Sequence, residues 1–269
     1  MLQLHTLDRY KDDQGNEIVY DGEVRHENID IRFKGSNNTL VIDARADIKD
    51  LVVNFTGNNG RVEIAPTSEK RVGLRFQMRC GHESLIRIGE NVGCAGRTFI
   101  SAVEGVSVTL GTDVMLSRNI EIRADDSHPI YDVRTEKRLN PSRSIVVGDH
   151  VWIAKHAVLL GGATIGDGSV IGYRSIVTSS VPNNCVAVGS PARVVRRNIA
   201  WQRPVLAPRR PGEQYPRKGE KTEQYWNLTV DEDVVPASPV VRKKPGPARR
   251  LFRRLPAPVR RLARKLRSS

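Results

Sequence analysis

A histidine followed by a proline stands out in this sequence as a residue that could do chemistry. His128 begins the polar string HPIYDVRTEKRLNPSRS, and Trp152 follows further along the chain in the string VWI. A neutral imidazole can take a proton from a weakly acidic group near neutral pH and return it to a leaving group. A histidine in a polar segment can equally be an ordinary surface residue, so the elements around His128 decide between the two interpretations.

Repeats of six residues lie on both sides of this histidine. Six consecutive hexapeptides, VGDHVW, IAKHAV, LLGGAT, IGDGSV, IGYRSI and VTSSVP, run from Val147 to Pro182. A period of six fits neither an α-helix nor a simple two-residue alternation. It is typical of a triangular β-coil, in which each hexapeptide forms one face and three faces close a turn. The aliphatic residues that open the hexapeptides, and that we expect to stack inside, are Val147, Ile153, Leu159, Ile165, Ile171 and Val177.

The same six-residue phase begins earlier, at Ile88, and is interrupted before the polar insert. The strings IGENVG, CAGRTF and ISAVEG are followed by four extra residues, VSVT, before LGTDVM, LSRNIE and IRADDS lead to His128. The segment from His128 to Ser144 has no period and contains two prolines. We expect it to protrude as a loop from the solenoid wall, because sites are often built on loops that a rigid scaffold positions.

Composition excludes several classes of protein. No run of about 18 apolar residues is present, which argues against a membrane-spanning helix. The first residues lack the basic and apolar pattern of a signal peptide. Three cysteines in 269 residues are too few for a disulfide scaffold and suit a reducing compartment. We therefore expect a cytoplasmic protein, with the inner face of the membrane as a candidate place of peripheral association.

The net charge of +13 comes from the end of the chain. Twelve of the 43 Lys and Arg residues lie from Arg242 onward with no Asp or Glu among them, which leaves 31 basic against 30 acidic residues elsewhere. Residues 248–269 place Leu251, Leu255, Val259, Leu262 and Leu266 three or four residues apart among arginines and lysines. This spacing predicts a basic, partly helical amphipathic tail that lies on an anionic membrane surface. A polyanionic glycan, a partner protein and a purely solubilising role are the alternatives. Nucleic acid is not expected, because no aromatic residues interleave with the charge.

Residues 125–196 resemble the hexapeptide-repeat O-acetyltransferases, which include galactoside, maltose and capsule polysaccharide O-acetyltransferases. The strings that carry the resemblance are DDSHPIYD, IVVGDHVWIAKHAVLLGGATIGDGSVIGYRSIVTSSVP and AVGSPARVVRR. The resemblance implies an all-β protein with a left-handed parallel β-helix, a homotrimer, and acetyl-CoA in a groove between neighbouring subunits. It also implies acetyl transfer to a sugar hydroxyl of a cell-surface polysaccharide or glycolipid precursor.

The resemblance also implies roles for particular residues. His128 is the expected general base, and Trp152 is expected to cover the thioester. Asp125, Asp126 and Asp132 are candidates for orienting the histidine ring. The residues expected to contact acetyl-CoA are Ala154, Lys155, Gly161, Tyr173, Thr178, Ser179, Arg193 and Arg196. No metal is expected.

Elementary chemistry supports part of this assignment. Coenzyme A carries a pyrophosphate and a 3′-phosphate, which guanidinium groups bind in bidentate fashion. The Gly161–Gly162 pair would let the pantetheine arm approach the backbone closely. A backbone N–H near Ala154 or Lys155 could stabilise the oxyanion of the tetrahedral intermediate. Because no Ser or Cys nucleophile is paired with His128, we expect direct transfer within a ternary complex.

Some positions and some functions stay open at this point. Arg97 and Gly105 stand where galactoside-type enzymes carry an Asn and an Asp, so a simple galactoside is not the expected acceptor and Arg97 would suit an acidic one. An N-acetyltransferase of an amino sugar or drug and a non-catalytic β-solenoid scaffold are alternatives. A γ-type carbonic anhydrase needs three converging histidines, whereas His150 and His156 hold equivalent places in successive hexapeptides and would lie on successive faces.

The sequence therefore predicts four regions. Residues 1–80 are expected to form an N-terminal β cap with irregular early coils, and residues 81–200 the left-handed β-helix acyltransferase domain. Residues 201–247 are rich in proline and charge and are expected to be a linker. Residues 248–269 complete the chain as the basic amphipathic tail.

Overall fold

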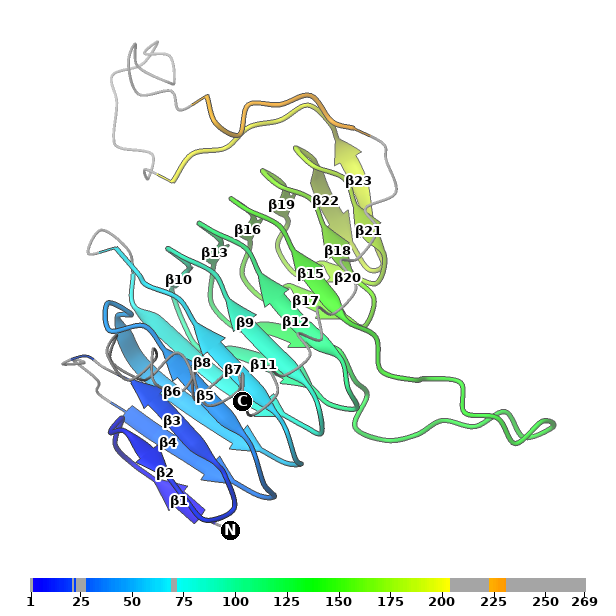
Figure 1. Cartoon of the computed structure of the whole chain (residues 1–269). Helices are drawn as coiled ribbons and strands as arrows, with labels where there is room; N and C mark the ends of the chain where they lie inside the picture. Colours follow the sequence, from blue (N-terminus) through cyan, green and yellow to red (C-terminus); the bar gives the residue numbers. More distant parts are fainter. Residues whose placement is uncertain (1, 21, 23–27, 69–71, 204–222, 231–269) are drawn as a thin grey trace, which may run out of the picture. The chain divides into compact units, whose positions relative to one another are not determined.

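The computed structural model describes residues 2–20, 22, 28–68, 72–203 and 223–230. Over these residues the chain forms 23 β-strands in three sheets and no helix (Figure 1). Among the same residues, no helix has the length and apolar character needed to cross a membrane. The all-β solenoid expected from the hexapeptide repeats is confirmed.

Each successive coil contributes one strand to sheet A and one to sheet B, and from β10 onward also one to sheet C. Sheet A has eight strands in the order β1 (Leu2–Leu4), β4 (Asn28–Phe33), β6 (Ile48–Phe55), β8 (Leu74–Cys80), β11 (Thr98–Ala102), β14 (Ile120–Arg123), β17 (Val158–Leu160) and β20 (Ile176–Val177). Sheet B has nine strands in the order β2 (Tyr10–Lys11), β3 (Glu17–Tyr20), β5 (Thr39–Ile42), β7 (Arg61–Ile64), β9 (Leu85–Ile88), β12 (Ser107–Leu110), β15 (Ile145–Val147), β18 (Thr164–Ile165) and β21 (Ser180–Val181). Sheet C has six strands in the order β10 (Gly93–Cys94), β13 (Met115–Leu116), β16 (Trp152–Ile153), β19 (Val170–Ile171), β22 (Val186–Gly189) and β23 (Ala192–Arg196).

Strand pairing within the sheets is parallel except at the two ends of the solenoid. β1 pairs antiparallel with β4, β2 with β3, and β22 with β23. Antiparallel strands at the ends cover sheet edges that would otherwise expose unpaired backbone groups. The strands of residues 28–80 pair in parallel within the same sheets as the later strands. Regular coils therefore occupy a region where irregular ones were expected, while the division at residue 80 stays a prediction.

The length of a coil changes along the chain. Thr98 of β11 pairs with Phe76 of the preceding coil, whereas Ile176 of β20 pairs with Val158 of the preceding coil. The first of these coils is longer than the second by four residues. The coil that follows it, in which Thr98 pairs with Ile120, has the same greater length and contains VSVT, which accounts for the interruption of the six-residue phase. One coil is much longer still, because Glu121 of β14 pairs with Val158 of β17. That coil contains the insert.

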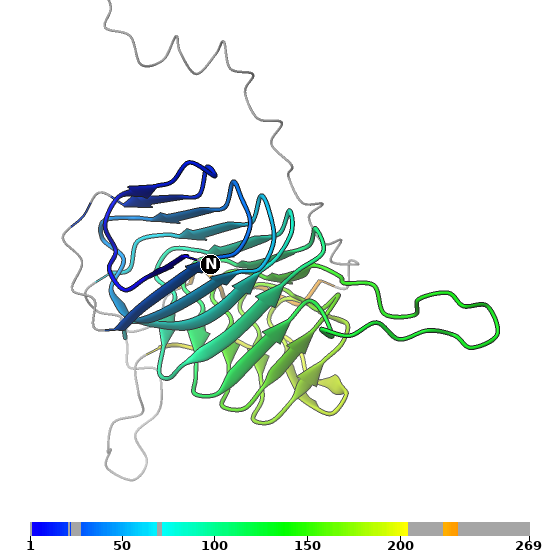
Figure 2. The ribbon, with the colours of Figure 1, turned by 90° about the horizontal axis from the view of Figure 1, so that it is seen from below.

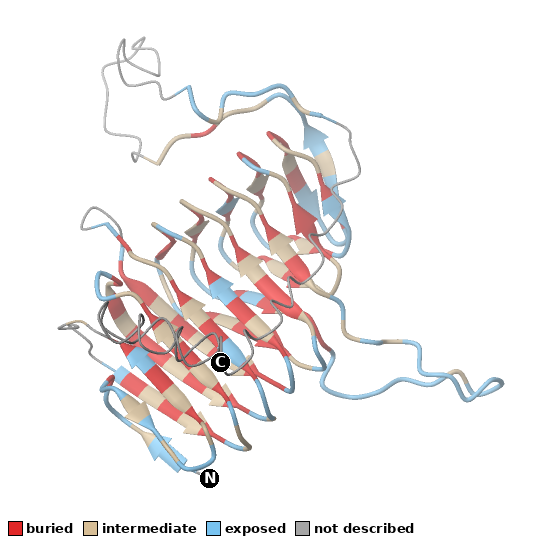
Figure 3. Cartoon of the chain, viewed as in Figure 1, coloured by how far each residue is buried: buried red, intermediate tan, exposed pale blue. Residues whose placement is uncertain are grey.

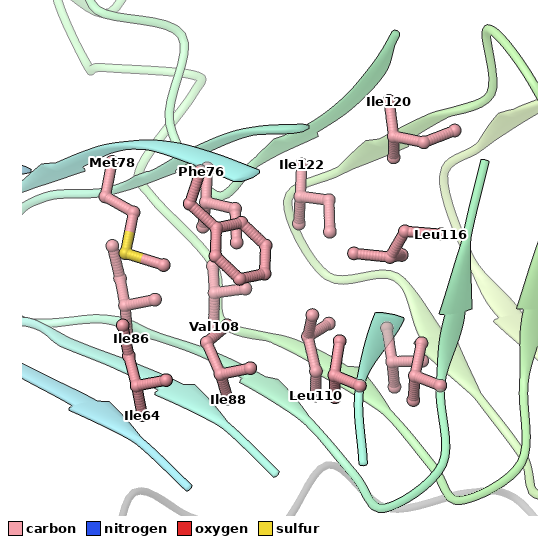
Figure 4. Packing of buried hydrophobic residues seen from close by; sticks show 14 of the residues in the cluster. Ile64, Phe76, Met78, Ile86, Ile88, Val108, Leu110, Leu116, Ile120 and Ile122 are labelled. Carbon is pink, nitrogen blue, oxygen red and sulfur yellow. The ribbon is translucent and has the colours of Figure 1, made fainter. Parts of the chain in front are cut away.

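The interior of the solenoid is made of stacked aliphatic columns. The six residues that open the hexapeptides are all buried, as expected. One column of sheet A consists of Ile31, Val53, Met78, Ile100, Ile122, Leu159 and Val177. Figure 4 shows how such columns meet across the interior, and Figure 3 shows buried positions alternating along the strands with mostly half-buried ones. Each fully buried Ile, Leu or Val stabilises the fold by about 1.5–3 kcal/mol relative to an exposed one, so the wall is a rigid support.

Corners with left-handed backbone conformation repeat in register. At the corner between sheets B and C, the residues with positive φ are Asn91, Asp113, His150, Gly168 and Asn184. Glycine, asparagine and aspartate adopt this conformation at low cost. The backbone N–H of His150 donates to Thr112 O (2.7 Å), and that of Asn184 donates to Asp167 O (2.8 Å), so successive coils are tied together here. We refer to these five residues as the B–C column.

The insert leaves the solenoid at the corner between sheets A and B. β14 ends at Arg123 and β15 begins at Ile145, and the segment between them projects far from the wall (Figures 1 and 2). This confirms the protruding loop expected from the sequence. Residues 248–269, expected to be an amphipathic tail, lie outside the described residues, as does most of the expected linker 201–247.

Candidate functional site

The start of the loop is fixed by a buried carboxylate. Asp125 has a side chain only 2% exposed and forms an ion pair with Arg79 of β8. The Ser101 hydroxyl donates to Asp125 Oδ2 (2.5 Å), and the backbone N–H of Ser127 donates to Asp125 Oδ1 (3.1 Å). Arg79 also donates to the Ser127 hydroxyl (2.9 Å). A buried charge is tolerated when it is paired and hydrogen-bonded. Here the Arg79–Asp125 pair anchors Ser127, the residue just before His128, to two earlier coils.

Asn140 joins the two limbs of the loop beside His128. Its side-chain amide donates to the His128 carbonyl (2.9 Å) and to Asp126 Oδ2 (2.9 Å). Its side-chain carbonyl oxygen accepts from the backbone N–H of Ile130 (2.7 Å). The backbone around His128 is therefore held on both sides, while its side chain stays exposed.

The Asn140 bonds form one clasp of the loop, and a second clasp holds its returning limb. Arg138 makes two hydrogen bonds to Glu104, at 2.7 and 2.9 Å, and the Ser142 hydroxyl donates to the same carboxylate at 2.7 Å. The bonds from Arg138 and Ser142 lower the pKa of Glu104 to about 2. Glu104 lies at a corner of the preceding coil, so the clasp ties the loop to the solenoid wall.

The three loop aspartates bind groups other than the imidazole ring. Asp125 and Asp126 are engaged as described, and Asp132 accepts from the backbone N–H groups of Arg134 (2.9 Å) and Thr135 (2.8 Å). These two backbone bonds, that of Thr135 first, lower the pKa of Asp132. In the described part of the chain, none of the three aspartates orients the His128 ring.

Trp152 lies on a different side of the solenoid from the loop. It is the first residue of β16 in sheet C, and its side chain is partly exposed. In a coil with three faces, sheet C is the face opposite the A–B corner, from which the loop leaves. The fold of one chain therefore places His128 and Trp152 apart, and the two can share one site only if each comes from a different copy of the chain.

The expected cofactor-binding residues fall into three places. Gly161, Thr178 and Ser179 lie at the A–B corner, on the side of the loop. Ala154, Lys155 and Tyr173 lie at the corner between sheets C and A, and the Tyr173 side chain is more than half exposed. Arg193 and Arg196 lie on the terminal strand β23 and are exposed. The group at the A–B corner therefore lies on the same side of the solenoid as the loop that carries His128. The group at the C–A corner lies beside sheet C, which carries Trp152.

Two backbone features bear on the expected chemistry. The Ala154 N–H donates to Ile171 O (2.9 Å) within sheet C, so this donor is used by the sheet. Gly161 lies against the start and the end of the loop, because a Cβ there would stand 3.1 Å from Ala124 O and 3.4 Å from Arg143 O. The lack of a side chain at Gly161 therefore keeps the wall open where the loop leaves.

Arg97 does not offer an unpaired charge to an acceptor. Its Nε donates to Asp50 Oδ2 at 2.6 Å, and the Asp50 side chain is largely buried. The charge of Arg97 is thereby balanced within the solenoid. The acidic acceptor suggested by Arg97 in the sequence gains no support from this geometry.

Sequence reasoning missed an aromatic cluster at the B–C column. The His150 ring stacks between Trp201 (4.1 Å between centroids) and Tyr225 (4.5 Å). Asp113 accepts from Arg203 (2.7 Å) and lies 2.6 Å from His150 Nδ1. The signal that could have revealed it is the presence of Trp201, Tyr225 and Trp226 in a polar stretch of a chain with only 5% aromatic residues. In the described ranges, no group of three or more His, Cys, Asp or Glu residues could hold a metal ion.

Comparisons with known proteins agree with this architecture. The bacterial transferase hexapeptide (six repeats) family model matches residues 144–179. Polysialic acid O-acetyltransferase of Neisseria meningitidis is 31% identical over 170 residues, which cover 63% of this chain and 77% of that protein. Polysialic acid O-acetyltransferase of Escherichia coli O1:K1 / APEC is 34% identical over 108 residues, 40% of this chain and 35% of that protein. The crystal structure of the polySia-specific acetyltransferase NeuO has a TM-score of 0.65 and 33% identity, covering 72% of this chain and 87% of that one.

The solenoid, its hexapeptide repeats and the histidine-bearing loop define a hexapeptide-repeat transferase fold. The chain belongs to the hexapeptide-repeat O-acetyltransferase family. This confirms the resemblance drawn from the sequence. The chain spans only about a third to a half of the length of several curated relatives that it matches.

Proposed function

We propose that this protein transfers the acetyl group of acetyl-CoA to a hydroxyl of a sugar in a cell-surface polysaccharide or glycolipid precursor, with His128 as the general base. The observation that carries the proposal is the support of the loop base by the Asn140 bonds and by the Arg79–Asp125 ion pair. These contacts hold the backbone of His128 on both sides and leave the imidazole exposed. Family membership supports the reaction class, and the names of the matched relatives support a polysaccharide acceptor.

The reaction follows from the chemistry of an alcohol and a thioester. His128 accepts the proton of the sugar hydroxyl as the oxygen attacks the acetyl carbonyl carbon. The carbon–sulfur bond then breaks, and the proton passes from the imidazolium to the departing thiolate, which leaves as the free thiol of CoA. The histidine returns to its starting state, so no covalent acyl-enzyme forms. Of the two backbone donors considered for the oxyanion, the proposal favours Lys155, since the Ala154 N–H already donates within the sheet.

The proposal requires two copies of the chain for each site. His128 leaves the solenoid at the A–B corner, and Trp152, Lys155 and Tyr173 lie on or beside sheet C. A ring of copies in which the loop of one approaches sheet C of the next would bring these groups together. Closed cyclic assemblies use such heterologous contacts, and a homotrimer is the arrangement that we propose.

Two further parts of the proposal concern partners. The acceptor is proposed to be an acidic polysaccharide, because two of the matched relatives are named for polysialic acid. The basic segment 248–269 is proposed to place the enzyme on an anionic membrane surface, where charge attraction and buried leucines act together.

The test measures release of the CoA thiol from acetyl-CoA with a panel of glycan acceptors. Wild type is compared with His128→Ala, and His82→Ala serves as the matched control because His82 is a surface histidine of the same solenoid. We expect acceptor-dependent release that falls by about 10²- to 10⁴-fold in His128→Ala and is unchanged in His82→Ala. Equal rates in all three proteins would remove His128 from the mechanism. A wild type that neither binds acetyl-CoA nor releases thiol would favour the scaffold alternative.

A further inference from the structure

The described C-terminal residues 199–203 and 223–230, which we call the strap, lie along the B–C column (Figure 1). The Asn184 side chain donates to Ile199 O (2.9 Å) and to Tyr225 O (2.6 Å). The strap also bonds to the residue just before it, because Thr229 N donates to Asn198 Oδ1 (2.8 Å) and Asn198 N donates to Thr229 Oγ1 (2.9 Å). The strap is therefore tied to the last coils by backbone and side-chain bonds, unlike a free linker.

His150 fixes the strap at one point in the middle of the column. The Trp201 indole N–H donates to His150 O (2.9 Å), and His150 Nε2 lies 3.1 Å from Trp201 O. The rings of Trp201 and Tyr225 both stack on the His150 ring, with interplanar angles of 11° and 5°. Aromatic pairs of this kind contribute about 0.5–1.5 kcal/mol each beyond the area that they bury, so the position of the Trp201 ring is strongly determined.

Trp201 in turn contacts a residue of the candidate site. Its ring centroid lies 5.9 Å from that of Trp152, at an interplanar angle of 47°. Trp201 is 9% exposed and Trp152 is 37% exposed. The fixed, buried Trp201 indole therefore supports one side of the Trp152 indole. The rest of the Trp152 ring stays accessible to a ligand.

We propose that Trp201 is a positioning residue of the acyl-donor site, and that the strap is part of that site because it holds the Trp152 ring in the orientation that meets acetyl-CoA. This inference rests on the proposed function, in which Trp152 covers the thioester. Trp201 acts through Trp152 and does not touch the reacting atoms. Without its ring, Trp152 would gain rotamer freedom that must be lost again when the donor binds.

The contacts of the strap distinguish two roles, positioning of the Trp152 ring and simple covering of the edge of the last coils. A strap that only covered the last coils would need its bonds to Asn184 and Asn198, which lie near the end of the solenoid. The stack on His150 and the contact with Trp152 are additional, and they lie on the same side as β16. A positioning role predicts an effect on donor binding, whereas edge protection predicts an effect on stability alone.

The chain allows a matched fluorescence experiment, because Trp152, Trp201 and Trp226 are its three tryptophans. In a Trp226→Phe background, Trp201→Phe and Trp201→Leu each leave Trp152 as the sole tryptophan emitter. Phenylalanine keeps an aromatic ring against Trp152, and leucine keeps apolar volume without one. The dissociation constant of acetyl-CoA is measured from the change in tryptophan emission on titration, and KM and kcat from thiol release. Trp226→Phe alone, which keeps both Trp152 and Trp201, is the control. Thermal unfolding is recorded for every variant.

We expect the Leu variant to raise the dissociation constant and KM for acetyl-CoA about threefold to tenfold, which corresponds to the loss of one aromatic pair. The acceptor KM should be unchanged, and the Phe variant should lie close to the control. Equal donor affinity in the Leu, Phe and control proteins, with active enzyme, would overturn the role of Trp201 while leaving the proposed function intact. A wild type that does not bind acetyl-CoA would overturn both.

Discussion

Replacing Asp125 with asparagine removes the charge around which the loop base is built. The carboxylate receives bonds from Arg79, Ser101 and the Ser127 N–H, and its side chain is 2% exposed. Asparagine has nearly the same shape, so the change tests charge and bonding without creating a cavity. The variant leaves the Arg79 guanidinium, whose side chain is 29% exposed, without its anion.

The size of the effect can be worked out from these bonds. A hydrogen bond to a charged group contributes about 1.5–3 kcal/mol. Asparagine can still accept from the Ser127 N–H, so we expect a loss of about one such bond in the stability of the loop base. If His128 moves by about 1 Å as a result, acetyl transfer falls by about 100-fold, because reaction rates depend steeply on alignment. The KM for acetyl-CoA should change little, since none of the bonds that Asp125 makes goes to a donor-binding candidate.

Two measurements check this prediction. The first is thiol release from acetyl-CoA, and the second is the rate of trypsin cleavage in the loop, which carries Arg134 and Lys137. Asp132→Asn is the control, because it removes the same charge from the same loop away from its base. We expect Asp125→Asn to be cleaved faster and to lose kcat, and Asp132→Asn to resemble wild type. An Asp125→Asn protein with wild-type kcat would refute the claim that the loop base positions His128.

Two further predictions concern titrating groups. The bonds from Arg138 hold the pKa of Glu104 at about 2, below its ordinary 4.5, so the unfolded state binds the proton more tightly. The stability that this clasp contributes is present above pH 4.5 and is lost as the pH falls toward 2. Pepsin cleavage of the loop, taken as a ratio to Glu104→Gln to cancel the protease's own pH dependence, should rise over that range; a flat ratio would contradict the clasp. Burial raises the pKa of Cys80 and Cys94 to about 12, so at pH 8 only about one thiol in ten thousand is ionised. Ellman's reagent should therefore modify these two cysteines only after denaturation, and rapid labelling of either in the native protein would show that the packing is wrong.

The hexapeptide pattern predicted the solenoid because its period is a direct consequence of the coil. A residue such as Ile153 stacks on Ile171 one coil away, so both must be aliphatic, and this requirement is visible in a single sequence. The polar insert was visible for the complementary reason, since residues that do not stack carry no period. The early coils were less clear, because each is longer than three hexapeptides, as the pairing of Phe76 with Thr98 shows, and the extra residues hide the period of six.

The clasps and the strap were hidden because they depend on pairings across long distances in the sequence. Glu104 meets Arg138 34 residues later, and Asp113 meets Arg203 90 residues later. No local pattern marks such pairs, and the proline- and charge-rich composition around Trp201 suggested a linker. The separation of His128 from Trp152 was likewise invisible in their spacing along the chain, because it depends on which corner of the coil carries the insert.

The central claim is that His128 and Trp152 belong to different chains when they act together. The most direct test co-refolds two inactive variants, His128→Ala and Trp152→Ala, in equal amounts, and measures thiol release by the mixture. If each site takes its histidine from one subunit and its tryptophan from the next, random mixing in a ring restores about one quarter of the sites. We predict activity near a quarter of wild type in the mixture and almost none in either variant alone. A mixture as inactive as its components would contradict a site shared between chains.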